Sequence, residues 1–150
     1  MSKIQKVLAT GRTRTTAAHP GHFHGNLNIS LTAPGSTAPR HDFANVIPHP
    51  TAEQLFAGAW SACYSAAIAL VAKERKITLP PDTAVEIEVD LGQNGNDYFI
   101  QGRLTLVVPG LDQVVATDLA HGADQICPYS KATRGNIDVS LTVVTIRNEN

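Results

Sequence analysis

The chain reads HPTAEQLFAGAWSACYSAA from His49 to Ala67, and this stretch determines where the central helix begins. Thr51 followed three residues later by Gln54 is a capping-box pattern, in which each side chain bonds the other residue's backbone N–H. Glu53 lies in the predicted first turn, where the helix dipole favours negative charge. We therefore expect a long helix to start directly after Thr51.

The residues that follow leave this helix no polar side. Apolar and small residues occupy nearly every position until Lys73, Glu74 and Arg75. A helix that is apolar all round belongs in a core, and its small residues let other backbone approach closely. We expect it to be the buried centre of the fold, with Cys63 near its middle.

Length and composition indicate a single domain, residues 1–150, that can bury a core of its own. The formal net charge is -1 and no basic stripe is present, so we expect no nucleic-acid partner. No apolar window approaches the roughly 18 residues of a membrane span, and no apolar run follows the N-terminal lysines. We expect a cytoplasmic protein that has no membrane partner.

Alternating apolar and polar residues predict the strands, which we place at 6–16, 26–32, 85–91, 98–108 and 136–145. The third and fourth form a hairpin around an Asn94-Gly95 turn signal. A second, amphipathic helix is predicted from 111 to 126, with Cys127 at its end and Pro128 as its stop. This order favours an α+β fold with a mostly antiparallel sheet.

Two stretches before the central helix read as loops. The segment after the first strand contains His19, His22 and His24, but no acidic or Cys partner lies nearby, so we expect no metal site. The segment 34–50 is rich in proline and contains Arg40. Loops of this length are often functional.

The two cysteines, Cys63 and Cys127, are 64 residues apart and fit no zinc-binding pattern. Two interpretations remain open from the residues alone. Each cysteine can be a small buried hydrophobe. Alternatively, one is a reactive thiolate that a peroxide oxidises to a sulfenic acid, and the other resolves that acid as a disulfide.

Two motifs carry a family resemblance. One is Ala52–Ala57, AEQLFA, with Cys63 ten residues after Glu53; the other is Cys127–Val139, CPYSKATRGNIDV. Both resemble the organic hydroperoxide resistance (Ohr) branch of the OsmC/Ohr family. The resemblance covers the chain from about Thr51 to Val143.

The resemblance implies mostly antiparallel sheets wrapped around a buried central helix in an intertwined homodimer, with active sites at the interface. It implies a thiol-dependent peroxidase for organic and lipid hydroperoxides, with Cys63 attacking the peroxide and Cys127 resolving it. Lipoyl groups of other proteins would return the electrons, and no cofactor is expected. A rival hypothesis is a binding or sensor protein for oxidised lipids on the same scaffold.

The resemblance also pairs Glu53 with an arginine that holds the thiolate, and here this chain departs from the family. His19 stands where the arginine is expected. An imidazole is mostly neutral at pH 7 and offers a thiolate a weaker field than a guanidinium does. Arg40 and Arg14 are the candidate substitutes.

Glu53 and Cys63 cannot touch within one straight helix, because ten residues span about 15 Å. Either the helix breaks near Gly58, or the Glu53 that completes a site comes from the second subunit of a dimer. We prefer the second alternative, because an all-round apolar helix needs more cover than one chain supplies.

Aromatic residues lie near the two cysteines in the sequence. Phe56 and Trp60 are expected in the core, with one of them as a candidate to line an apolar pocket for the organic part of the peroxide. Tyr129 is expected to serve packing.

Overall fold

The computed structural model describes residues 4–19, 22–35 and 51–146, and it contains one five-stranded sheet with three helices. In chain order the elements are β1 (Lys6–His19), β2 (His22–Thr32), α1 (Ala52–Glu74), β3 (Ala84–Asn94), β4 (Asp97–Val107), α2 (Gln113–Ile126), α3 (Pro128–Thr133) and β5 (Val139–Val144). The sheet order is β2-β1-β3-β4-β5, and only β4 and β5 pair in parallel. The predicted α+β fold with a mostly antiparallel sheet is confirmed.

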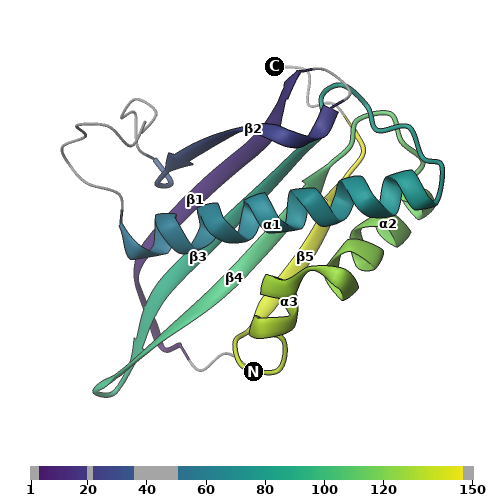
Figure 1. The fold of residues 1–150 in the computed structure, drawn as a ribbon. Coiled ribbons are helices and arrows are strands. Elements are labelled where there is room, and N and C mark those ends of the chain that lie inside the picture. Colours follow the sequence, from purple (N-terminus) through teal and green to yellow (C-terminus); the bar gives the residue numbers. More distant parts are fainter. Residues whose placement is uncertain (1–3, 20–21, 36–50, 147–150) are drawn as a thin grey trace.

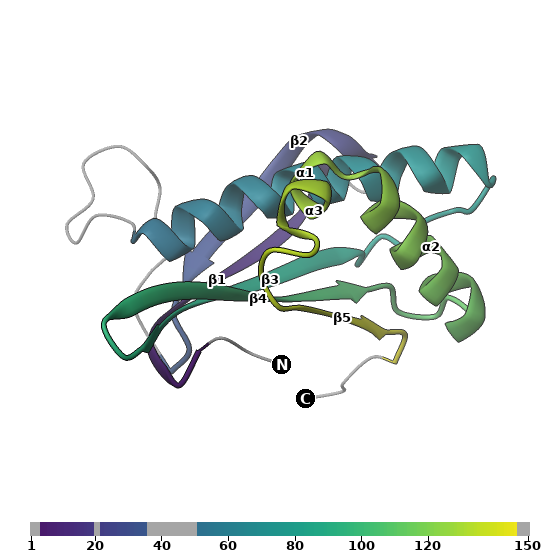
Figure 2. The same ribbon diagram turned by 90° about the horizontal axis from the view of Figure 1, so that it is seen from below.

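The three helices lie on the same face of the sheet. α1 crosses the strands, and α2 and α3 lie beside it over β4 and β5 (Figure 1). The view from below shows β3, β4 and β5 under the helices, while β2 rises to the level of α1 (Figure 2). The described part of the chain is thus a helical layer on one sheet.

The capping box predicted from Thr51 and Gln54 is present. The Thr51 Oγ1 accepts the Gln54 N–H at 3.1 Å, and the Gln54 side-chain oxygen accepts the Thr51 N–H at 2.9 Å. The Gln54 amide also donates to the Thr32 carbonyl at 3.0 Å, which joins the end of β2 to the start of α1. α1 then runs without interruption to Glu74.

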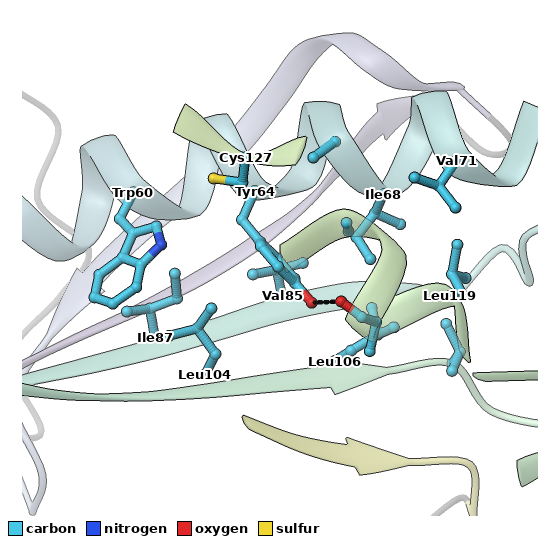
Figure 3. Packing of buried hydrophobic residues seen from close by; sticks show 14 of the residues in the cluster. Trp60, Tyr64, Ile68, Val71, Val85, Ile87, Leu104, Leu106, Leu119 and Cys127 are labelled. Atoms are coloured by element: carbon cyan, nitrogen blue, oxygen red, sulfur yellow. Dashed lines mark hydrogen bonds between the residues drawn. The ribbon is translucent and has the colours of Figure 1, made fainter. Parts of the chain in front are cut away.

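The core lies between α1 and the inward-facing residues of β3 and β4. Figure 3 shows Trp60, Tyr64 and Ile68 of α1 directed at side chains such as Ile87 and Leu106. Below the Trp60 ring lies Gly102, where an added Cβ would come within 2.9 Å of a ring carbon. The alternation that predicted β3 and β4 therefore reflects one strand face packed against α1.

Only one side of α1 is buried within a single chain. Its opposite side carries a row of apolar and small residues, the outer stripe, defined as Leu55, Ala59, Ala62, Ala66 and Leu70. Leu55 and Leu70 are 48% and 52% exposed. The expectation of a fully buried helix is thus wrong for one chain by itself.

By length and composition α1 could cross a membrane, which corrects the expectation that no segment approaches this limit. The core helix of a globular fold passes the same test, and half of the most apolar part of α1 is buried inside the chain. The packing of α1 on the sheet accounts for the apolar character of its inner side without a membrane.

Three local expectations need correction or fall outside the description. His19 and His22 pair with each other as the last residue of β1 and the first of β2, so the predicted turn with histidines is mostly strand. The second helix ends at Ile126 before Pro128, as predicted, but Pro128 also begins a further short helix, α3, which was not expected. Arg40 lies in 36–50, outside the described residues.

Candidate active site

Cys127 lies at the junction of two helices. It is the C-cap of α2 and the N-cap of α3: its N–H donates to the Ala123 carbonyl at 2.9 Å, and its carbonyl accepts the Lys131 N–H at 3.0 Å. Pro128 fits the first position of α3, because its fixed φ suits a helix and its missing N–H would have had no helical partner. The Cys127 side chain is fully buried.

The structure brings Cys63 and Cys127 together although they are far apart in the sequence. The Cys127 side chain lies close enough to the Cys63 thiol to raise its pKa, and both cysteines are free thiols. Cys63 is partly exposed on α1, whereas Cys127 is buried. An accessible thiol therefore lies against a buried one.

The surroundings of Cys63 in one chain disfavour its thiolate. Burial raises the pKa of Cys63, the backbone N–H of Tyr129 lowers it by hydrogen bonding, and the charge and hydrogen bond of Cys127 raise it again. The net effect is a raised pKa. Among the residues that the structure describes, no arginine contributes to this shift.

Glu53 lies in the first turn of α1, and the helix is continuous through Gly58. The broken-helix alternative is therefore wrong, and Glu53 stays about 15 Å along the axis from Cys63 of the same chain. Any contact between these two residues requires a second chain.

The structure places the three candidates for stabilising the Cys63 thiolate differently. Arg14 is on the wrong face of the sheet: its neighbours Thr13 and Thr15 are buried, whereas Arg14 forms an ion pair with Glu86. Successive strand residues point to opposite faces, so Arg14 cannot reach Cys63 of its own chain. His19 ends β1, with its side chain outside the description, and Arg40 lies in the undescribed segment.

Of the aromatic candidates, Trp60 is fully buried and Phe56 partly so, with their rings edge to face at 5.9 Å. Trp60 is thus a core residue, and Phe56 stays the candidate for a pocket wall. Tyr129 is 40% exposed, so it packs only in part, and its packing role stays a prediction. Its backbone N–H is the group that reaches Cys63.

Sequence reasoning missed two residues beside the thiols, Tyr64 and Ser130. The Tyr64 hydroxyl donates to the Ala120 carbonyl at 2.7 Å, and Ser130 Oγ accepts the Trp60 indole N–H at 3.3 Å. Within the described ranges, no group of three or more His, Cys, Asp or Glu is placed to hold a metal ion.

Comparison with known proteins shows the family of this chain. The model of the family described as OsmC-like protein matches residues 44–142. The organic hydroperoxide resistance protein of Xanthomonas axonopodis pv. citri is 36% identical over 143 residues, which are 95% of this chain and 99% of that protein. The chain belongs to the OsmC/Ohr family.

Solved structures of the family have the same fold. A crystal structure of an organic hydroperoxide resistance protein from Elizabethkingia anophelis is 30% identical, with a TM-score of 0.61 over 95% of this chain and 99% of that one. The OhrB structure of Bacillus subtilis is 32% identical, with a TM-score of 0.60 over 87% and 96%. The Ohr branch expected from the two motifs is confirmed.

Proposed function

We propose that this protein is a thiol-dependent peroxidase that reduces organic hydroperoxides. The observation that carries the proposal is the contact between the partly exposed Cys63 and the buried Cys127. Relatives that align with nearly the whole chain are named organic hydroperoxide resistance proteins. The proposed cellular role is therefore an antioxidant stress response in the cytoplasm.

In the proposed reaction the Cys63 thiolate attacks the outer peroxide oxygen. The O–O bond breaks, an alcohol leaves after taking up a proton, and Cys63 becomes a sulfenic acid. The Cys127 thiolate then attacks the Cys63 sulfur, so that an S–S bond forms and water leaves. A dithiol, which we propose is a lipoyl group on another protein, returns two electrons by thiol-disulfide exchange.

The active form in this proposal is a homodimer. The outer stripe of α1 is apolar and uncovered in one chain, and a second copy would cover it. The partner would also supply a glutamate at the position of Glu53, which cannot reach Cys63 in its own chain. His19 and Arg40 are the remaining candidates to hold the thiolate, and Phe56 the candidate for a pocket wall.

The test is the rate of Cys63 oxidation by an alkyl hydroperoxide and by hydrogen peroxide, followed by a thiol count. We expect a faster reaction with the alkyl hydroperoxide, loss of both thiols in the wild-type protein and no reaction in Cys63→Ser. Cys127→Ser should stop at a sulfenic acid that a trapping reagent captures. Oxidation no faster than that of free cysteine would refute the peroxidase.

The second candidate is a binder or sensor of oxidised lipids that has lost efficient peroxidase chemistry. The raised pKa of Cys63, with no arginine among its described causes, favours this alternative. It predicts that an oxidised lipid binds without turnover. Binding of a fluorescent oxidised fatty acid, measured together with the oxidation rate, separates the two candidates.

A further inference from the structure

α1 forms hydrogen bonds to residues that precede and that follow Cys127 in the sequence. On the N-terminal side, the Tyr64 hydroxyl donates to the Ala120 carbonyl in α2 at 2.7 Å, the dashed line in Figure 3. After Cys127, the Trp60 indole N–H donates to Ser130 Oγ in α3 at 3.3 Å. The buried thiol thus lies between two tethered points of its own chain.

Both donors lie on the helix that carries the other thiol. Trp60 and Tyr64 are four residues apart and therefore share one face of α1, and Cys63 directly precedes Tyr64. The three contacts run in order along α1, since Trp60 meets Ser130, Cys63 meets Cys127 and Tyr64 meets Ala120. A shift of the junction along α1 would have to break both hydrogen bonds.

Breaking either bond inside the core is costly. Trp60 and Tyr64 are fully buried, and a buried donor that loses its partner has no water to replace it. Within the described residues, the backbone bonds of Cys127 join it to Ala123 and Lys131, in its own two helices. They shape the junction but do not hold it to α1.

We propose that Tyr64 and Trp60 are positioning residues that set the place of the Cys127 thiol against Cys63, and so the ease with which the two form a disulfide. This inference deepens the proposed function, because that reaction passes through the disulfide. The redox equilibrium of the pair needs no peroxide, so the two proposals can fail separately.

The experiment equilibrates the full-length protein with reduced and oxidised glutathione. Two protein thiols give up two electrons and two protons, and one glutathione disulfide becomes two thiols. In Tyr64→Phe we expect the equilibrium constant for the Cys63–Cys127 disulfide to fall by about tenfold, which is about 30 mV for a two-electron couple. Mass spectrometry identifies the disulfide.

Thr15→Val is the matched control. It removes another buried hydroxyl bonded to α1, since Thr15 Oγ1 donates to Ser61 Oγ at 2.8 Å from the strand side. Its urea midpoint should fall about as much as that of Tyr64→Phe, while its disulfide equilibrium stays at the wild-type value. If Tyr64 only stabilises the fold, Tyr64→Phe and Thr15→Val should lower the urea midpoint equally and should change the disulfide equilibrium equally. That result would overturn the proposal.

Ser130→Ala tests the second tether without altering an aromatic ring. It removes the acceptor of the Trp60 N–H. Its control is Ser65→Ala, because the hydroxyl of this buried serine donates to the Ser61 carbonyl within α1. We expect only Ser130→Ala to shift the glutathione equilibrium, also by several-fold. If neither Tyr64→Phe nor Ser130→Ala shifts it, the tethers do not position the thiols, whatever the peroxide assay shows.

Discussion

At Cys63, two groups from one neighbouring segment act on the sulfur atom. The Tyr129 N–H of α3 lowers the pKa of this thiol, while burial and the neighbouring Cys127 raise it. Both of the thiol's named neighbours belong to the stretch Cys127–Tyr129. After burial, which is the largest cause of the raised pKa, the acidity of this thiol on α1 depends on a short segment at the end of α2.

Removing Cys127 should make Cys63 more acidic. Since the charge and the hydrogen bond of Cys127 both raise the pKa of Cys63, we expect Cys127→Ala to lower that pKa and to speed alkylation of Cys63 by iodoacetamide near neutral pH. The measurement is the alkylation rate against pH, with the modified site identified by mass spectrometry. Ser65→Ala should leave the midpoint of this pH curve unchanged. An unchanged midpoint in Cys127→Ala would contradict the prediction.

At the scale of the elements, β3 has two chemically different faces. Val85, Ile87 and Val89 are buried under α1, while the carboxylates of Glu88 and Asp90 point to the other face. There Arg103 of β4 bonds Asp90 at 2.5 and 2.9 Å and Glu88 at 2.8 Å. This cluster joins β3 to β4, and Thr10 of β1 donates to Asp90 as well, at 2.5 Å.

The cluster should make stability depend on acid pH. Burial opposes ionisation of Asp90, but hydrogen bonds from Arg103, Thr10 and Gln101 lower its pKa to about 2. The unfolded value is about 3.9, so the stabilisation is fully present above about pH 4 and is lost as pH falls towards about 2, with about 2 kcal/mol at stake. Urea unfolding at several pH values measures this loss.

The matched variants are Asp90→Asn and Asp118→Asn. Asp90→Asn should be less stable at neutral pH and should lose less further stability in acid. Asp118 is largely exposed and pairs with Arg75 at the surface, where such pairs contribute little, so Asp118→Asn should follow the wild-type curve. If the free energy of unfolding falls equally with acid pH in the wild-type protein and in Asp90→Asn, Asp90 does not have this role.

Periodicity and capping predicted the elements whose residues interact locally. The start of α1 follows from Thr51 and Gln54, and the hairpin of β3 and β4 follows from alternation and one turn signal. α3 was missed because Pro128 is equally compatible with the end of one helix and the first turn of the next. The parallel pairing of β5 with β4 has no local pattern at all.

The site was predictable only in part. Cys63 and Cys127 were chosen from motifs, whereas Tyr64 and Ser130 were missed because their hydrogen bonds join residues 56 and 70 positions apart. A buried tyrosine or serine in a sequence does not indicate its distant partner. Arg14 was a poor candidate for a reason the sequence already held, since the alternation of β1 separates it from Thr13 and Thr15.

At the scale of the whole molecule, the helical layer has an inner side and an outer side. The sheet covers the inner side of α1, and the outer stripe is exposed or half-buried in one chain. Because the stripe consists of small residues between Leu55 and Leu70, the α1 helix of a second copy could approach closely. The homodimer that we propose is the occupant that fits this surface.

The dimer is tested with a charge placed in the outer stripe. Ala59 is exposed in a single chain, so Ala59→Arg should leave the fold of one chain intact and disrupt the pairing of two. Sedimentation equilibrium should give twice the chain mass of 16.0 kDa for the wild-type protein and the mass of one chain for the variant. Gln125→Arg, at an exposed position of α2, should stay dimeric, and a monomeric wild-type protein would refute the dimer.

The apolar length of α1 also matters while the protein is being synthesised. The chain reaches Val107, the end of β4, 33 residues after Glu74, which at about 5–20 residues per second takes roughly 2–7 s. During that interval the ribosome presents a helix with the composition of a membrane span before most of its sheet exists. Only β1 and β2 have already been made, and they contact α1 through Thr15 and Thr32. We therefore expect nascent chains to depend on this early hairpin, or on chaperones, to keep α1 away from membrane-targeting factors.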